Sequence, residues 1–148
     1  MSLSNVFNIA GSGMSSQSIR LNTVASNMAN AESVSSSSGE TYRARQPVFQ
    51  LIQQQVSGGD GDYGSSSGMS AGQGVQVVDI VESQAPLRQQ YEPNHPMADE
   101  KGYVYYPNVN VVEEMTNMIS ASRSFQTNAD IMNTAKEMMQ RVLTLGQS

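Results

Sequence analysis

The fold of this chain depends on residues 111–145, which read VVEEMTNMISASRSFQTNADIMNTAKEMMQRVLTL. Apolar side chains recur there at alternating steps of four and three residues, the spacing of one face of a long amphipathic helix. The stripe comprises Val111, Met115, Met118, Ser122 (its polar exception), Phe125, Ala129, Met132, Ala135, Met138, Met139, Val142 and Leu145, flanked by Val112 and Ile119. Such a helix is roughly 50 Å long, so a second long helix is needed beside it.

Local signals mark both ends of this helix. Pro107 prevents a helix from continuing out of the upstream segment, and Asn110 is a suitable N-cap. Glu113 follows three residues later, as in a capping box. Gly146 is expected to end the helix in the left-handed conformation.

The N-terminal residues supply the second helix. They repeat the same alternation through Leu3, Phe7, Ala10, Met14, Gln17, Leu21, Val24, Met28 and Ala31, of which only Gln17 is polar. Two terminal stripes of this spacing predict an antiparallel coiled coil. The first helix is expected to end near Asn30.

Residues 1–31 carry a single charge, Arg20, and their polar face consists of uncharged side chains. A helix that faces bulk water normally carries many charges, so we expect neighbouring molecules to cover this one. Gly11, Gly13 and the many serines weaken an isolated helix. We therefore expect the terminal helices to be disordered in the free monomer and to order on assembly.

The middle of the chain has strand rather than helix patterns. We expect an α+β fold in which a small β-rich domain, residues 32–107, is inserted between an N-terminal helix, residues 1–31, and a C-terminal helix, residues 108–148. Short apolar or aromatic runs predict strands at residues 42–51, 75–81, 87–91 and 102–106. Ser/Gly-rich composition predicts flexible loops at residues 33–39 and 57–74.

Composition argues against most kinds of chemistry. The net charge of −5 and the lack of a basic cluster disfavour nucleic-acid binding, and the absence of cysteine excludes thiolate metal sites. The glycine-rich loop lacks the Lys of a phosphate-binding loop, and a calcium loop starting at Asp60 would have Ala71 where glutamate is required. We expect no enzyme activity, cofactor or metal. No apolar run or N-terminal signal predicts membrane insertion or Sec export.

Several blocks resemble the rod and hook axial proteins of the bacterial flagellum. ASNMANA at residues 25–31 is similar to the signature of their first helix, and SASRSFQTN at residues 120–128 is similar to their C-terminal motif. ESQAP at 82–86, YEPNHPMAD at 91–99, GYV at 102–104 and PNVN at 107–110 resemble the proximal rod proteins in particular. The resemblance spans nearly the whole chain, apart from the Ser/Gly loops.

The resemblance implies a structural subunit of the periplasmic rod, which transmits torque and surrounds the export channel. It implies that the terminal helices pack into the inner layer of the rod, and that subunits leave the cytoplasm through the flagellar type III export apparatus without a cleaved signal. The implied partners are further copies of the chain, rod proteins of the FlgB and FlgF types, and the FliE adapter. The expected assembly interface comprises Leu3, Phe7, Met14, Leu21, Val24, Asn27, Met28, Asn30, Met115, Met118, Ile119, Phe125, Asn128, Met132, Met139 and Leu145.

Two other classes are compatible with parts of the sequence. A needle-type or other axial component of a type III secretion system would share the helical ends but would not need the middle blocks. A small hydrolase could use His95, the only histidine, as a base. That second reading explains neither terminal helix.

Overall fold

The computed structural model describes residues 3–52 and 74–146. The elements are α1 (Leu3–Ala29), β1 (Arg45–Leu51), β2 (Val75–Glu82), β3 (Arg88–Tyr91), β4 (Tyr103–Tyr106) and α2 (Val111–Leu145). Of the predicted loop at 57–74, all but Gly74 lies outside the described residues. All four predicted strands are present, although β1 begins at Arg45 rather than at Tyr42.

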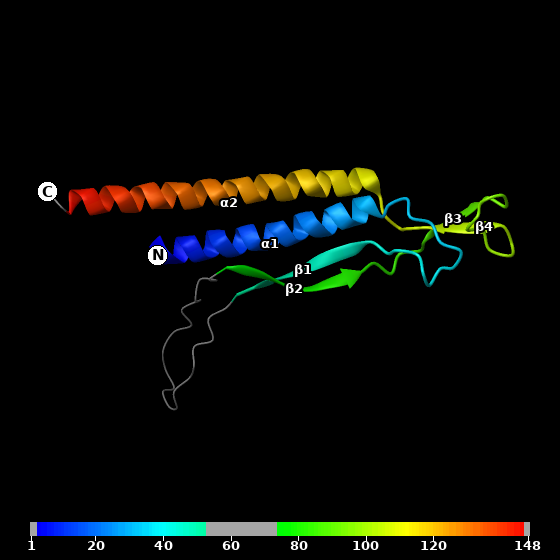
Figure 1. Cartoon of the computed structure of the whole chain (residues 1–148). Coiled ribbons are helices and arrows are strands. Elements are labelled where there is room, and N and C mark those ends of the chain that lie inside the picture. Colours follow the sequence, from blue (N-terminus) through cyan, green and yellow to red (C-terminus); the bar gives the residue numbers. More distant parts are fainter. Residues whose placement is uncertain (1–2, 53–73, 147–148) are drawn as a thin grey trace, which may run out of the picture.

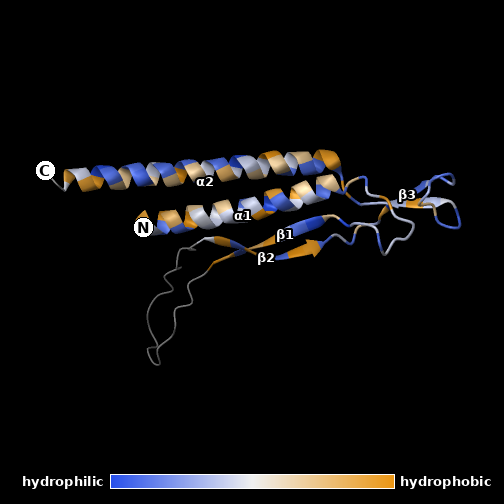
Figure 2. Ribbon diagram, viewed as in Figure 1, coloured by the Kyte–Doolittle hydropathy of each residue, from blue (hydrophilic) through white to orange (hydrophobic). Residues whose placement is uncertain are grey.

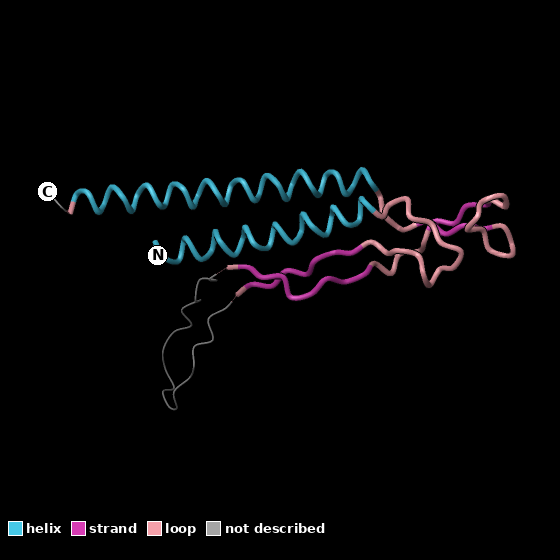
Figure 3. Tube along the Cα trace, in the orientation of Figure 1, coloured by secondary structure: helices cyan, strands magenta, loops and turns pink. Residues whose placement is uncertain are grey.

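The two terminal helices lie side by side and antiparallel (Figures 1 and 3). A Cβ atom built on Gly11 of α1 would lie 3.8 Å from the terminal methyl of Met132 in α2. One on Gly13 would lie 2.9 Å from Nδ2 of Asn128, so the glycines let the helices approach closely. The predicted fold class, two long terminal helices around a small antiparallel sheet region, is confirmed.

The face of α2 that meets α1 differs in part from the predicted stripe. Met118, Phe125 and Met132 are partly covered, but the buried residues of α2 are Glu114, Ala121 and Ala135. Met115, by contrast, is half exposed. The predicted stripe includes Ala135 but leaves out Ala121, a small residue whose burial lets the two helix backbones come near.

Of the predicted end signals of α2, the structure shows the N-cap but not the left-handed C-terminal stop. The side chain of Asn110 accepts a hydrogen bond from Val112 N at 3.1 Å, as an N-cap does. Gly146 does not adopt the predicted left-handed conformation, since its φ is −81° and its ψ is −4°. Its N–H still donates to the carbonyl of Val142, so the last helical turn closes without a positive φ.

The four strands form two separate two-stranded antiparallel sheets, β1–β2 and β3–β4. The β1–β2 hairpin runs beside α1, while β3–β4 lies beyond the end of the helical pair (Figure 1). Two serines of α1 hold the hairpin: Ser16 Oγ donates to the carbonyl of Val75 at 3.1 Å, and Val75 N donates to Ser12 Oγ at 3.2 Å. The serine-rich face of α1 is therefore a docking face for the hairpin.

The β3–β4 sheet buries one apolar side chain completely and pairs two exposed aromatic rings. Val104 is fully buried, and the rings of Tyr91 and Tyr103 meet edge to face with centroids 5.3 Å apart. Gly102 enters β4 with φ +82°, a conformation that favours glycine. Ser35, in the predicted flexible loop 33–39, exchanges two backbone hydrogen bonds of 3.1 Å with Tyr105 and so ties this loop to β4.

Candidate assembly surface

Asn27, in the last full turn of α1, organises the junction between the helix and β1. Its side chain is 1% exposed. Its Nδ2 donates to the carbonyl of Arg45 at 2.8 Å, and its Oδ1 accepts from Arg45 N and from the Tyr42 hydroxyl, both at 2.9 Å. One neutral amide thereby supplies hydrogen-bond partners for both the N–H and the carbonyl of Arg45. A backbone group without a partner is costly wherever the packed chain excludes water.

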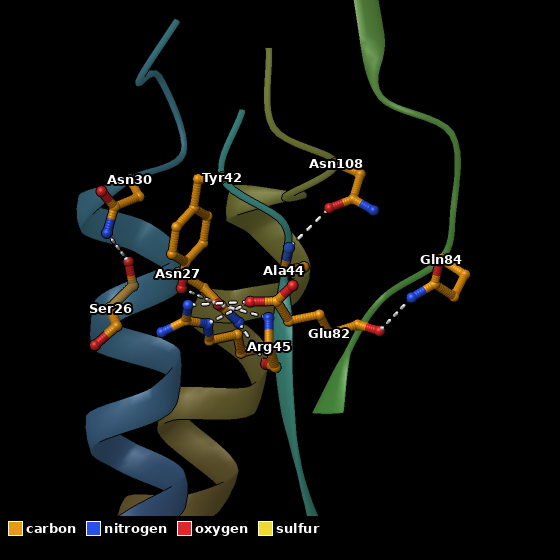
Figure 4. Close-up of polar contacts among 9 residues, drawn as sticks. All are labelled: Ser26, Asn27, Asn30, Tyr42, Ala44, Arg45, Glu82, Gln84 and Asn108. Atoms are coloured by element: carbon orange, nitrogen blue, oxygen red, sulfur yellow. Dashed lines mark hydrogen bonds and ion pairs between the residues drawn. The ribbon is translucent and has the colours of Figure 1, made fainter. Parts of the chain in front are cut away.

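Charged and aromatic side chains surround this junction (Figure 4). Arg45 forms an ion pair with Glu82 across the β1–β2 hairpin, with 3.0 Å between Nη2 and Oε1. The guanidinium also lies 5.4 Å from the centroid of the Tyr42 ring. Burial raises the pKa of the Tyr42 phenol, and Arg45 partly offsets that rise. Tyr42 is therefore held as a neutral hydrogen-bond donor to Asn27.

Asn108 makes the matching connection from the other helix. It lies two residues before the N-cap of α2, and its Oδ1 accepts from Ala44 N at 2.8 Å. Its Nδ2 donates to the carbonyl of Ala85 at 2.9 Å. Residues 44 and 45 are thus held by one asparagine from each helical end, as Figure 4 shows.

A hollow of about 390 Å³ lies between α1, β1 and the start of α2. Arg20 lines it and donates to Asn117 Oδ1 at 2.9 Å. Glu114 also lines it, and its buried Oε2 has no hydrogen-bond partner in the part of the chain that the structure describes. The single charge of α1 and the buried carboxylate of α2 therefore face the same space.

The predicted interface residues fall into three groups by exposure. Val24 and Asn27 are buried inside the subunit. Partly covered by the subunit's own chain are Phe7, Met14, Leu21, Met28, Asn30, Met118, Phe125, Asn128 and Met132. Exposed are Leu3, Met115, Ile119, Met139 and Leu145. The helical pair therefore covers only part of the set.

Two apolar surfaces of α2 stay exposed. We call Val112, Met115 and Ile119 the outer stripe; Val112 alone is 73% exposed. We call residues 138–145 the overhang, because α2 continues past the start of α1 (Figure 1). Met138, Val142 and Leu143 in the overhang are more than half exposed, and Figure 2 shows apolar residues at both ends of α2. Clustered exposed apolar residues of this kind mark protein–protein contacts.

Sequence reasoning missed several residues of the junction. Tyr42, Arg45 and Glu82 carry no periodic signal, because their partners lie far away in the chain. Asn108 stands inside the quoted PNVN block, yet nothing in the sequence indicates that it reaches Ala44. Glu114 lies in the first turn of α2, where a carboxylate complements the helix dipole, and it is also buried.

The polar residues near His95 have structural partners. His95 Nδ1 accepts from Met97 N at 3.1 Å, which stabilises the turn at residues 93–97. Asp99 Oδ1 accepts from Lys101 N and Tyr103 N, both at 2.8 Å, which closes the turn into β4. Among the described residues there is no cluster of His, Cys, Asp and Glu that could hold a metal, and neither helix is apolar and long enough to cross a membrane.

Comparison with known families matches both ends of the chain. Residues 7–34 match the family described as "Flagella basal body rod protein", and residues 100–145 match "Flagellar basal body rod FlgEFG protein C-terminal". The first match covers all of α1 except its first four residues, and it includes Asn27; the second covers β4 and α2.

Individual relatives align over the full length. The chain is 51% identical over 147 residues to the flagellar basal-body rod protein FlgC of Escherichia coli O6:H1, covering 99% of this chain and all of that protein. It is 50% identical to FlgC of Salmonella typhimurium, with the same coverage. It is 35% identical over 154 residues to FlgC of Borreliella burgdorferi, covering 99% of each. The chain therefore belongs to the FlgC family of flagellar basal-body rod proteins.

Proposed function

We propose that this chain is a structural subunit of the rod of the bacterial flagellar basal body. The observation that carries the proposal is full-length similarity to the FlgC proteins of Escherichia coli and Borreliella burgdorferi. The geometry agrees with it. A long helical pair with uncovered apolar surfaces suits a subunit whose core is completed by its neighbours.

The exposed apolar residues supply the neighbour contacts in this proposal. The outer stripe and the overhang would be covered in the rod, together with the exposed Leu3 and Ile9 of α1. The Arg20 charge already has a partner in Asn117 within the subunit. Because the rest of α1 carries no charge, covering it does not require charges to be desolvated.

The predicted interface residues then have two roles. Val24, Asn27 and the partly covered residues hold α1 against α2 and the hairpin within a subunit. Met115, Ile119, Met139 and Leu145 contact other subunits. We propose that the helices at residues 1–31 and 108–148 form the axial layer around the export channel, and that residues 32–107 lie outside it.

Torque transmission follows from the same geometry. α2 spans 35 residues, or about 52 Å, and its contact with α1 would stiffen it along its length. Subunits of this shape, packed around an axis, would form a shaft that resists twisting. We propose rod proteins of the FlgB and FlgF types and the FliE adapter as neighbours, and the flagellar type III apparatus as the export route.

Complementation tests the proposal. The gene is expressed in a motile bacterium that lacks its own FlgC, and basal bodies are then isolated and imaged by electron microscopy. We expect restored motility and complete rods that contain the chain. Basal bodies that stop before the rod, despite normal amounts of exported chain, would contradict the proposal. Restoration of a needle-type secretion system instead would favour the other axial class.

A further inference from the structure

The contact between α1 and α2 has a repeated composition. In α1, the large apolar residues Phe7, Met14, Leu21 and Met28 recur every seven residues. In α2, the partly covered Met118, Phe125 and Met132 recur at the same interval, and Met139 continues that spacing into the overhang. A slip of seven residues, about 10 Å, would move Gly11, which now faces Met132, opposite Phe125 or Met139, and so would again pair it with a large apolar side chain. Apolar packing alone therefore discriminates poorly between registers, a role that polar residues fulfil in coiled coils.

The junction at residues 44 and 45 does discriminate between registers. Asn27 near the end of α1 binds both backbone groups of Arg45, and Asn108 just before α2 binds the N–H of Ala44. Since Ala44 and Arg45 are adjacent, these bonds set how far the end of α1 lies from the start of α2. The register of the two helices follows from that distance.

We propose that Asn27 and Asn108 are positioning residues that select the register of α1 against α2, with the backbone of residues 44 and 45 as the link between them. A slipped register would pull Asn27 away from Arg45 and Tyr42. It would leave an amide that is now 1% exposed without its three partners. A buried amide without hydrogen-bond partners is strongly disfavoured, so the native register is more stable than the registers slipped by seven residues. This inference does not depend on the proposed function.

Disulfide trapping tests the proposal in the full chain, which has no cysteine of its own. Gly13→Cys with Asn128→Cys reports the native register, because a Cβ on Gly13 would lie 3.2 Å from Asn128 Cγ. Gly13→Cys with Ala121→Cys or with Ala135→Cys reports slips of seven residues in either direction. A disulfide captures closed conformations even when they are brief, and mass spectrometry after mild oxidation gives the ratio of native to slipped cross-links.

We expect the native cross-link to dominate in the otherwise unchanged chain. Combining Asn27→Ala with Asn108→Ala should lower the native-to-slipped ratio by about tenfold, as the loss of one or two net hydrogen bonds predicts. Asn22→Ala is the matched control, because Asn22 is an exposed residue of α1 that takes no part in the bonds to residues 44 and 45.

Three results would overturn the proposal. The first is an unchanged ratio in the double alanine variant. The second is equal native and slipped cross-linking before either asparagine is changed. The third is loss of all cross-links in the double variant while both single variants keep the native ratio, because the asparagines would then stabilise the pair without selecting its register.

Discussion

Single side chains hold this molecule together through neutral polar groups as much as through apolar ones. Asn27 and Asn108 form hydrogen bonds with backbone groups of residues 44 and 45, which would otherwise lack partners between the hairpin and the helices. Ala121 is fully buried against α1, while Phe125 beside it is only partly covered. The two helices approach closely at small residues, while the large apolar residues are only partly covered. Apolar surface is therefore left for contacts with neighbouring subunits.

Phe125 is the residue at which a single change should disrupt assembly most. Phe125→Asp places a carboxylate in the partly covered contact between the helices, at a cost of about 3 kcal/mol or more. We expect loss of motility while the chain is still made and exported. Gln126→Asp, at the exposed neighbouring position, is the control and should leave motility intact. A motile Phe125→Asp strain with normal basal bodies would contradict the prediction.

Tyr42 predicts a specific pH dependence. Burial raises the pKa of its phenol in the folded state above the unfolded value, so the folded state holds this proton more tightly. The contribution is fully present below the unfolded pKa, which is about 10, and is lost as the pH rises through the folded value. We expect the free energy of unfolding to fall over that alkaline range.

The Tyr42→Phe variant isolates the contribution of the Tyr42 hydroxyl to the free energy of unfolding. It should be less stable by about 1 kcal/mol at neutral pH, because the hydrogen bond to Asn27 is lost. It should also lose part of the alkaline destabilisation. Unfolding of assembled rods, followed by circular dichroism from neutral to alkaline pH, measures both effects. Parallel pH profiles for the variant and the parent chain would exclude a role for Tyr42.

Among the elements, α1 depends most on its surroundings. It contains two glycines and several serines, and it packs between α2 and the β1–β2 hairpin. The hairpin depends on α1 in turn, since an isolated two-stranded sheet is marginal in water and Ser12 and Ser16 anchor this one. These elements should therefore order together.

Hydrogen exchange tests this coupling. In the purified monomer, we expect the amides of residues 3–29 and of β2 to exchange almost as fast as in an unfolded peptide. Both sets should become protected in assembled rods, where neighbouring subunits cover α1. Strong protection of residues 3–29 in a verified monomer would show that the helical pair is stable alone, and that ordering does not wait for assembly.

At the scale of the whole molecule, changes in the outer stripe should affect assembly without affecting the fold of the subunit. Met115 and Ile119 are half exposed in the subunit, so they contribute little to its internal packing. Met115→Lys combined with Ile119→Asp should leave the circular dichroism of the purified chain unchanged and abolish its incorporation into rods. Electron microscopy of basal bodies measures the second effect. Ser120→Glu, at an exposed polar neighbour, should assemble normally, and normal rods from the double variant would exclude the stripe from the interface.

The sequence by itself determined the two terminal helices, their antiparallel pairing, the four strands and the family. Those features depend on local spacing, on caps such as Asn110, and on contiguous blocks that are readable in one dimension. Only the tertiary structure decided which face of α2 meets α1, because Ala121 and Met115 are both apolar and periodicity does not choose between small and large side chains. It also decided that the strands form two sheets, and that Asn27, Tyr42, Ala44 and Asn108 meet at one junction. Those contacts join residues that are distant in the chain, and their hydrogen bonds leave no periodic pattern in the sequence.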